Sequence, residues 1–377
     1  MTQSIAAESD AALALFLELA ALPSPPGEER AVADVVLQYL RDLGLDPDED
    51  DAGAAVGSTM GNIYARLEPA AAGTPLFFCA HLDTVPPSGP LEPVVENGVV
   101  RNAGGTILGA DDKSAVVTML EAVRRVLTEG RPHAGIELIF TPKEEVGLLG
   151  VAAFDHDRLR ADLGYVYDQA APIGEIILGA PHAQAMNVTF HGRAAHSGMF
   201  PEEGRSAIQA AAKAIADLRL GRIDEETTAN VGTISGGTAG NIVPEWCSFL
   251  AEARAHDERR LADLVQEMLD VFSFAATSCD CEVETEARKD YRGYRFKRDD
   301  DVVVLAAAAL ARCGYEPTYA LSGGAADANV FNERGRRCVN LANGMTDIHT
   351  PDERIAVEDL GRMIDVTLAL LDEALAG

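Results

Sequence analysis

Residues 75–80 read PLFFCA and residues 135–141 read GIELIFT, two short apolar runs of the kind that form strands buried on both faces of a sheet. Between them, residues 112–128 carry apolar side chains at helical spacing, which predicts an amphipathic helix. A strand, a helix and a second strand in this order are typical of a mostly parallel sheet with helices on both faces. The sequence therefore predicts an α/β fold, whose functional residues should follow the carboxyl ends of the strands.

A different pattern begins near residue 183. Its expected elements follow the order strand, helix, strand, strand, helix, strand, at residues 185–191, 206–218, 229–234, 246–254, 258–274 and 281–287. This order is that of a ferredoxin-like α+β unit. The first pattern then resumes near Tyr294. We therefore expect one domain made of residues 1–182 and 293–377, with residues 183–292 inserted into it as a second domain.

The charge of the chain limits its partners. The 377 residues carry a formal net charge of −29 and contain no Lys/Arg-rich run, so the chain should repel phosphate backbones and anionic membrane surfaces. We expect no nucleic-acid partner and no membrane association. The apolar segment 11–22 is too short to span a bilayer and is expected to be a helix facing the core. Six scattered cysteines without a secretory signal favour reduced thiols and a cytoplasmic protein.

Two polar motifs adjoin the expected strands and helix. His81 ends the first apolar run, and Asp83 follows it closely. A histidine that binds zinc needs an acceptor at its other ring nitrogen, and Asp83 is available for that role. The motif GADDK at residues 109–113 places two acids at the start of the helix. One carboxylate there can bridge two cations, although Asp is also among the best helix N-caps.

Further acids and a histidine lie in other loops. Glu144 and Glu145 follow the second apolar run, where one can bind a metal ion while the other acts as a general base; a solvated acidic loop is the alternative. Asp168, after the apolar stretch 163–167, and His349, in a late loop, are each ordinary when taken alone. Together with the motifs above they supply three carboxylates and two imidazoles. Such a set satisfies two zinc ions if one carboxylate bridges them.

With these motifs, the chain resembles the di-zinc exopeptidases that include peptidase T, carboxypeptidase G, aminoacylase and acetylornithine deacetylase. The matching segments run nearly from end to end: HLDTV at 81–85, GADDK at 109–113, EEVGL at 144–148, Asp168, residues 192–208, residues 236–245 and His349. The resemblance implies that one zinc ion is held by His81, Asp111 and Asp168. The second zinc ion is then held by Asp111, Glu145 and His349. Cobalt or manganese can substitute in such sites.

The resemblance also implies roles in catalysis and binding. Asp83 should orient His81, and Glu144 should be the general base that takes a proton from a water bridging the metal ions. The inserted domain should act as a lid and should join two copies of the chain into a homodimer. Its His196 should stabilise the tetrahedral oxyanion, often from the partner subunit. The residues that match positions binding the substrate's carboxylate or backbone are Asn241, Arg254 and the loop Ser322-Gly323-Gly324.

The residue at position 168 bears on the choice of reaction. Family members that act at a free amino terminus tend to have Asp there, whereas carboxypeptidases and deacylases tend to have Glu. The motifs look most like the peptidase T branch, although Gln169-Ala170-Ala171 and Gly324-Ala325-Ala326-Asp327 depart from its pattern. The resemblance thus implies a zinc metallopeptidase that releases the N-terminal residue of short peptides. An N-acyl-amino-acid deacylase or a carboxypeptidase is the alternative, and a non-catalytic binding protein is disfavoured because no expected ligand is missing.

Overall fold

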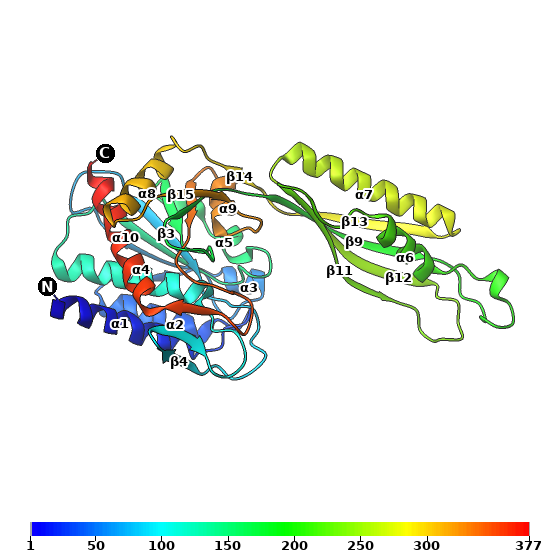
Figure 1. The fold of residues 1–377 in the computed structure, drawn as a ribbon, viewed down its shortest axis with the longest axis horizontal. Helices are drawn as coiled ribbons and strands as arrows, with labels where there is room; N and C mark the ends of the chain where they lie inside the picture. The colour runs from blue at the N-terminus through cyan, green and yellow to red at the C-terminus, as the bar shows by residue number, and fades with distance from the viewer. Residues whose placement is uncertain (1, 377) are drawn as a thin grey trace. The chain divides into compact units, whose positions relative to one another are not determined.

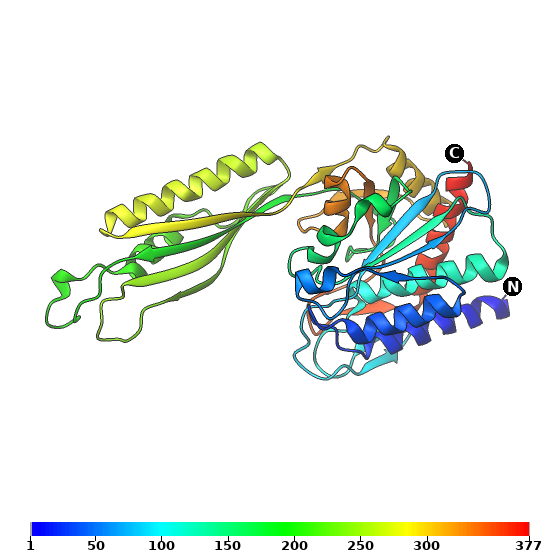
Figure 2. The same cartoon turned by 180° about the vertical axis from the view of Figure 1, so that it is seen from behind.

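The structure, a computed structural model, describes residues 2–376 of the chain. These residues form two compact units (Figure 1, Figure 2). The larger unit contains the described residues up to Gly179 and from Phe296 onward, and the smaller unit contains Ala180–Arg295. The sequence places the inserted domain at residues 183–292. Each unit has its own buried apolar core.

The larger unit is built on a sheet whose central strands are parallel. Its strands lie in the order β1 (Asp48–Glu49), β2 (Ile63–Leu67), β6 (Ile136–Thr141), β3 (Leu76–His81), β7 (Leu163–Val166), β16 (Arg337–Leu341) and β8 (Glu175–Ala180), and β15 (Thr318–Leu321) pairs with β8. The neighbours β6, β3, β7 and β16 are parallel, whereas the pairs β1–β2, β2–β6 and β16–β8 are antiparallel. Every residue of β3 and β6 is buried. The predicted mostly parallel sheet is therefore confirmed.

Helices cover both faces of this sheet, as two neighbouring residues of β3 illustrate. The Phe77 ring lies 4.7 Å from the ring of Phe331 in α9 (Asp327–Glu333), whereas the Phe78 ring lies 6.1 Å from that of Tyr165, in the main core. The helices that contribute to that core are α1 (Thr2–Ala20), α2 (Arg30–Asp42), α4 (Ala110–Glu129), α8 (Asp301–Arg312) and α10 (Val357–Ala376). On the other side, α5 (Leu149–Ala153) packs beside α9, and α3 (Ala52–Val56) packs beside α5.

A small sheet brings a late loop beside the segment that precedes α4. Its strands lie in the order β17 (Arg354–Ala356), β5 (Val99–Asn102) and β4 (Pro93–Glu96). Ile355 pairs antiparallel with Val100. This pairing carries the loop at residues 346–353 toward the loop at residues 103–109 and the start of α4, and both segments contribute to the candidate site.

The smaller unit has one antiparallel sheet with two helices packed on one face. The strands lie in the order β10 (Gly221–Asp224), β11 (Thr227–Gly236), β12 (Trp246–Ala255), β9 (His182–His191) and β13 (Glu282–Tyr291). Alternate residues of β12 are buried against α6 (Ala207–Asp217) and α7 (Glu258–Ser278). Apart from the short edge strand β10, this is the predicted ferredoxin-like arrangement. The chain leaves this unit through β14 (Tyr294–Arg295).

The helix expected at residues 11–22 is present as far as Ala20, where α1 ends, and Leu15, Phe16 and Leu19 lie in the core as predicted. No helix within residues 2–376 is both long enough and apolar enough to cross a membrane. All six cysteines are free thiols.

Candidate metal centre

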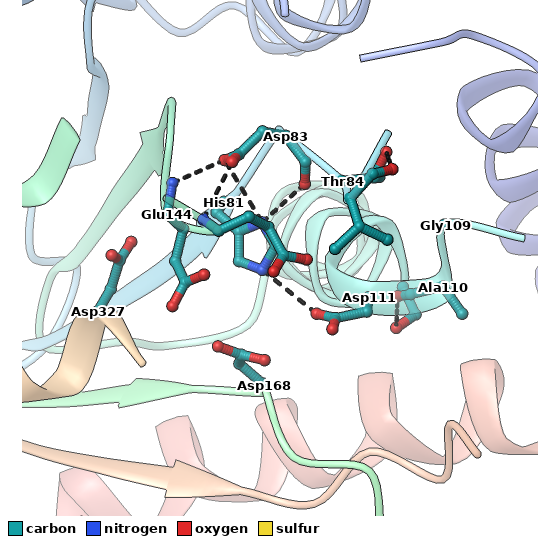
Figure 3. Close-up of polar contacts among 12 residues, drawn as sticks. His81, Asp83, Thr84, Gly109, Ala110, Asp111, Glu144, Asp168 and Asp327 are labelled. Atoms are coloured by element: carbon teal, nitrogen blue, oxygen red, sulfur yellow. Dashed lines mark hydrogen bonds and ion pairs between the residues drawn. The ribbon is translucent and has the colours of Figure 1, made fainter. Parts of the chain in front are cut away.

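The candidate site lies at the carboxyl edge of the parallel strands of the larger unit. His81 is the last residue of β3, Glu144 and Glu145 follow β6, and Asp168 follows β7. The carboxyl ends of these strands meet at one edge because β6, β3 and β7 are adjacent and parallel. Four of the predicted site residues therefore share this edge, and Figure 3 shows three of them, His81, Glu144 and Asp168.

Asp111 presents its two carboxylate oxygens to two different histidines. Its Oδ1 lies 3.2 Å from Nε2 of His81, and its Oδ2 lies 3.0 Å from Nε2 of His349, in the loop before β17. The backbone of Asp111 (φ −81°, ψ 105°) is not helical, although the residue belongs to the first turn of α4. Gly109 is the N-cap and has no side chain of its own to cap the helix, and neither carboxylate oxygen of Asp112 has a hydrogen-bond partner among the described residues, so the capping role that the sequence allowed for Asp111 and Asp112 is absent.

A third contact indicates that these residues fit a cation. The Nε2 atom of His349 lies 3.0 Å from Oε1 of Glu145 as well as 3.0 Å from Oδ2 of Asp111. One ring nitrogen carries at most one proton, which cannot point at two carboxylates at once. A cation coordinated by all three groups suits this arrangement better. The potential ligand atoms of His81, Asp111 and Glu145 also lie within 4.8 Å of one another.

The charges of these groups are strongly interdependent. In the metal-free chain, the hydrogen bond with Asp111 and the nearby carboxylate of Glu145 raise the pKa of His349 to about 10. Burial opposes the protonation of His81, but the hydrogen bond with Asp111 and the surrounding carboxylates raise its pKa well above its ordinary value. Burial raises the pKa of Glu144 well above its ordinary value, and neighbouring carboxylates add to this effect. The site thus concentrates negative charge that cations would neutralise.

Asp83 holds several of these residues in place. Its two carboxylate oxygens accept the backbone N–H groups of Glu144, at 2.9 Å, and Glu145, at 3.1 Å. Its backbone carbonyl lies 2.8 Å from Nδ1 of His81, whereas its carboxylate lies 3.6 Å from that nitrogen. The carbonyl favours a proton on Nδ1 and leaves Nε2 to face Asp111. The main chain of Asp83 therefore orients His81, while the side chain positions the two glutamates.

Asp168 is fixed mainly through its backbone. Asn340, in β16, accepts its N–H at 2.9 Å and donates to its carbonyl at 2.6 Å. Burial raises the pKa of Asp168 well above its ordinary value, and the charges of Asp111 and Glu144 add to this effect. Figure 3 shows the side chains of Asp168 and Glu144 pointing toward the same region of the site. Asp168 and His349 are both outside the group of ligand atoms that lie within 4.8 Å of one another among the described residues.

Two buried acids beside the centre are not predicted from the sequence. Glu353 accepts backbone N–H groups of the loop that leads to Asp111. Asp327, the first residue of α9, accepts a hydrogen bond from the Thr141 hydroxyl at 2.6 Å, and no described group donates to its Oδ1. The available signal for Glu353 is its place in the run HTPDE at 349–353, directly after the candidate ligand His349.

Three further predicted residues lie in the smaller unit, at two separate ends of its sheet. His196 and Asn241 are neighbours, since the Ser197 N–H donates to the Asn241 carbonyl at 3.0 Å. Arg254 lies near the opposite end of β12 and forms an ion pair with Glu252 at 3.0 Å. The strand from residue 246 to residue 254 spans about 26 Å at the usual rise per residue. Arg254 is therefore distant from His196 within this unit.

The loop Ser322-Gly323-Gly324 follows β15 in the larger unit. The Ser322 N–H donates to the Gly179 carbonyl at 2.9 Å, and the Ser322 hydroxyl accepts the Gly324 N–H at 3.1 Å. A Cβ atom added at Gly323 would meet no atom within 4 Å, and one at Gly324 would meet only the Ser322 hydroxyl, at 3.9 Å. The loop is thus held in place beside open space, where a ligand can approach its backbone.

The chain matches the model of the peptidase family M20/M25/M40 over residues 77–373. It is 39% identical over 359 residues to the uncharacterized protein YqjE of Bacillus subtilis, covering 95% of this chain and 97% of that protein. The crystal structure of aminopeptidase PepT from Bacillus cereus superposes with a TM-score of 0.88 at 37% identity, covering 98% of this chain and 99% of that one. A tripeptidase structure from Staphylococcus aureus superposes with a TM-score of 0.93 at 33% identity, with the same coverage.

The fold and the cluster of carboxylates and imidazoles define a metal-dependent hydrolase. The chain belongs to the peptidase family M20/M25/M40 and is a metallopeptidase. The family resemblance stated from the sequence motifs is therefore confirmed.

Proposed function

We propose that this metallopeptidase is an aminopeptidase that releases the N-terminal residue of short peptides at a centre of two zinc ions. The observation that carries the proposal is the Asp111 carboxylate, whose oxygens lie 3.2 and 3.0 Å from ring nitrogens of His81 and His349. A carboxylate shared in this way suits a pair of metal ions. Similarity to an aminopeptidase and to a tripeptidase, each over nearly its whole length, supports action at a free amino terminus.

In this proposal, His81, Asp111 and Asp168 hold one zinc ion, and Asp111, Glu145 and His349 hold the other. Imidazole and carboxylate ligands also suit cobalt and manganese. Bound metal ions supply positive charge that polarises the scissile carbonyl and makes water a stronger acid.

Glu144 acts as the general base. Its backbone is held by the hydrogen bond from its N–H to Asp83, and its side chain is buried beside the proposed ligand Glu145. The carboxylate accepts a proton from the attacking water and later donates it to the leaving amine. A positioned base of this kind contributes roughly 10²- to 10⁴-fold to the rate.

His196 stabilises the oxyanion of the tetrahedral transition state. Its Nδ1 accepts the backbone N–H groups of Gly198 and Met199, each at 3.2 Å, so the neutral ring carries its proton on Nε2. The side chain is exposed, which leaves this Nε2–H available to a substrate. A preorganised donor directed at developing negative charge lowers the barrier to hydrolysis.

The other predicted residues bind the ends and backbone of the peptide. The guanidinium of Arg254 suits the planar carboxylate of a short peptide. Asn241 lies beside His196, and the Ser322-Gly323-Gly324 loop offers backbone groups next to open space.

Two copies of the chain together form each complete substrate site. Arg254 and His196 lie at opposite ends of one sheet, separated by about 26 Å of strand, whereas an extended tripeptide spans only about 10 Å. If both residues bind one peptide, one of them comes from a second copy. Met199, Phe200 and Ile242 near His196 are exposed apolar side chains, which supports a homodimer through this unit.

A matched pair of substrates tests the reaction. Ala-Gly-Leu and N-acetyl-Ala-Gly-Leu are incubated with one preparation whose zinc content has been measured, and the products are identified by mass spectrometry. We expect release of alanine and Gly-Leu from the free tripeptide and no cleavage of the acetylated peptide. Release of acetate would instead indicate a deacylase, and loss of the C-terminal leucine from both peptides would indicate a carboxypeptidase.

A further inference from the structure

We propose that Glu353 is a positioning residue of the metal centre, which holds the loop carrying Asp111 against the loop carrying His349. This inference rests on the proposed function because it concerns the same two-metal site. It assigns Glu353 no contact with metal or substrate. Its effect is exerted through the orientation of Asp111.

The carboxylate of Glu353 accepts three backbone N–H groups from the end of one loop and the first turn of α4. Its Oε2 accepts the N–H of Leu108 at 2.8 Å and that of Gly109 at 2.9 Å, and its Oε1 accepts the N–H of Asp111 at 3.1 Å. The residue is only 1% exposed, so these hydrogen bonds form away from water. Glu353 and Asp111 are 242 residues apart in the sequence, so the bonds join segments that only the fold brings together.

The loop that receives these bonds is irregular and lacks a cap of its own. Gly109 has a left-handed backbone (φ 76°), and Asp111 has a non-helical one. The first N–H groups of a helix have no partner within the helix, and a capping side chain usually accepts some of them. Glycine has no side chain to do so, and the distant Glu353 accepts the N–H groups instead. The direction of the Asp111 carboxylate therefore depends on Glu353.

Glu353 is equally well fixed on its own side. Its N–H donates to the carbonyl of Thr350 at 3.2 Å, in the loop that contains His349. The next residue, Arg354, begins β17 and pairs with Arg101 of β5. One side chain thus connects the segment that supplies His349 to the segment that supplies Asp111. This connection accounts for the 3.0 Å approach of His349 Nε2 to Asp111 Oδ2.

The variant Glu353→Gln tests this role, because glutamine keeps the size of the side chain but has only one acceptor oxygen. Glu137→Gln is a matched control: Glu137 is also 1% exposed and accepts the N–H groups of Arg160 and Ala161, at 3.0 and 2.7 Å, near the amino end of β6. Metal-free wild type and both variants are titrated with Co²⁺, following visible absorption, and their thermal unfolding is recorded by circular dichroism.

We expect Glu353→Gln to weaken Co²⁺ binding about 10- to 100-fold, the usual effect of losing a group that orients a metal ligand, and to alter the absorption spectrum of bound Co²⁺. Glu137→Gln should bind Co²⁺ as the wild type does, although both variants unfold at lower temperature. Wild-type affinity in Glu353→Gln, or equal weakening in both variants, would overturn the proposal. A wild type that binds fewer than two Co²⁺ ions would instead count against the proposed two-metal function.

A second measurement needs no variant and no metal. In the metal-free wild type, hydrogen exchange at the backbone N–H groups of Leu108, Gly109 and Asp111 should be at least about tenfold slower than in a peptide of the same sequence. Exchange at the rate of the peptide would show that Glu353 does not hold the loop. That result would overturn the proposal even if Glu353→Gln failed to fold.

Discussion

The Nε2 atom of His349 lies 3.0 Å from Oδ2 of Asp111, although 238 residues separate the two in the sequence. The same nitrogen lies 3.0 Å from Oε1 of Glu145. A late loop, the start of α4 and the segment after β6 therefore converge on one position. That convergence is the structural basis for placing a cation there.

Replacing Glu144 should separate catalysis from metal binding. Because Glu144 is proposed as the base and not as a ligand, Glu144→Gln should keep the zinc content of the wild type and lower kcat roughly 10²- to 10⁴-fold. The neighbouring variant Glu145→Gln should lose zinc instead. Steady-state kinetics on trialanine and elemental analysis check both. Near-normal turnover in Glu144→Gln would remove Glu144 as the base.

Replacing Asp83 should affect both stability and metal binding. Asp83→Ala removes the acceptors of the Glu144 and Glu145 N–H groups, so the free energy of unfolding should fall by about 2–3 kcal/mol. Metal affinity should fall as well, because Glu145 loses its support. Asp83→Asn should be milder, since it keeps one acceptor oxygen. Urea unfolding and zinc titration measure these effects, and a stable Asp83→Ala chain with normal affinity would contradict this role.

Mixing two inactive variants tests whether His196 acts in the partner's site. Glu144→Ala lacks its base, and His196→Ala lacks its oxyanion donor, but a mixed dimer would contain one complete site. Random exchange of equal amounts makes half of the dimers mixed, so about a quarter of wild-type activity should return. Activity no higher than that of the separate variants would mean that His196 acts within its own chain or not at all.

Alanine at Gly323 should impair substrate binding without disturbing the fold. The added methyl group meets no protein atom within 4 Å, so stability should stay within about 0.5 kcal/mol, whereas KM for trialanine should rise roughly tenfold. Gly164→Ala is the contrasting variant, because its methyl group would lie 2.2 Å from the Phe77 ring in the core. That variant should unfold at lower temperature. An unchanged KM in Gly323→Ala would argue against substrate contact with this loop.

Much of the fold follows from local sequence patterns. The wholly apolar runs of β3 and β6 and the periodicity of α4 are strong local signals, and they predict the parallel sheet. The short edge strand β10 and the small β17-β5-β4 sheet are not predicted. Each of these strands has only three or four residues and no run of buried apolar side chains. Strands β10 and β4 pair with the strands that follow them in the sequence, whereas β17 is defined by its pairing with the distant β5.

The candidate site shows a similar limit. The sequence motifs name residues that meet around Asp111, because His81 and Glu145 follow recognisable strands and Asp111 begins a helix, whereas His349 lies in a late loop and depends mainly on the family resemblance. They do not reveal that Asp83 contacts His81 through its main-chain carbonyl, or that Glu353 accepts three N–H groups before Asp111. Such backbone contacts depend on φ and ψ angles and on loops brought together only by folding, which residue types do not specify.

The zinc content of the wild type and of Asp111→Asn tests the central claim most directly. Inductively coupled plasma mass spectrometry should find two zinc ions per wild-type chain. In the Asp111→Asn variant, once circular dichroism has shown that it is folded, the same measurement should find at least one zinc ion fewer per chain. The reason is that an amide is a poor bridge between cations. Fewer than two ions in the zinc-saturated wild type, or two ions retained by Asp111→Asn, would contradict a two-metal centre bridged by Asp111.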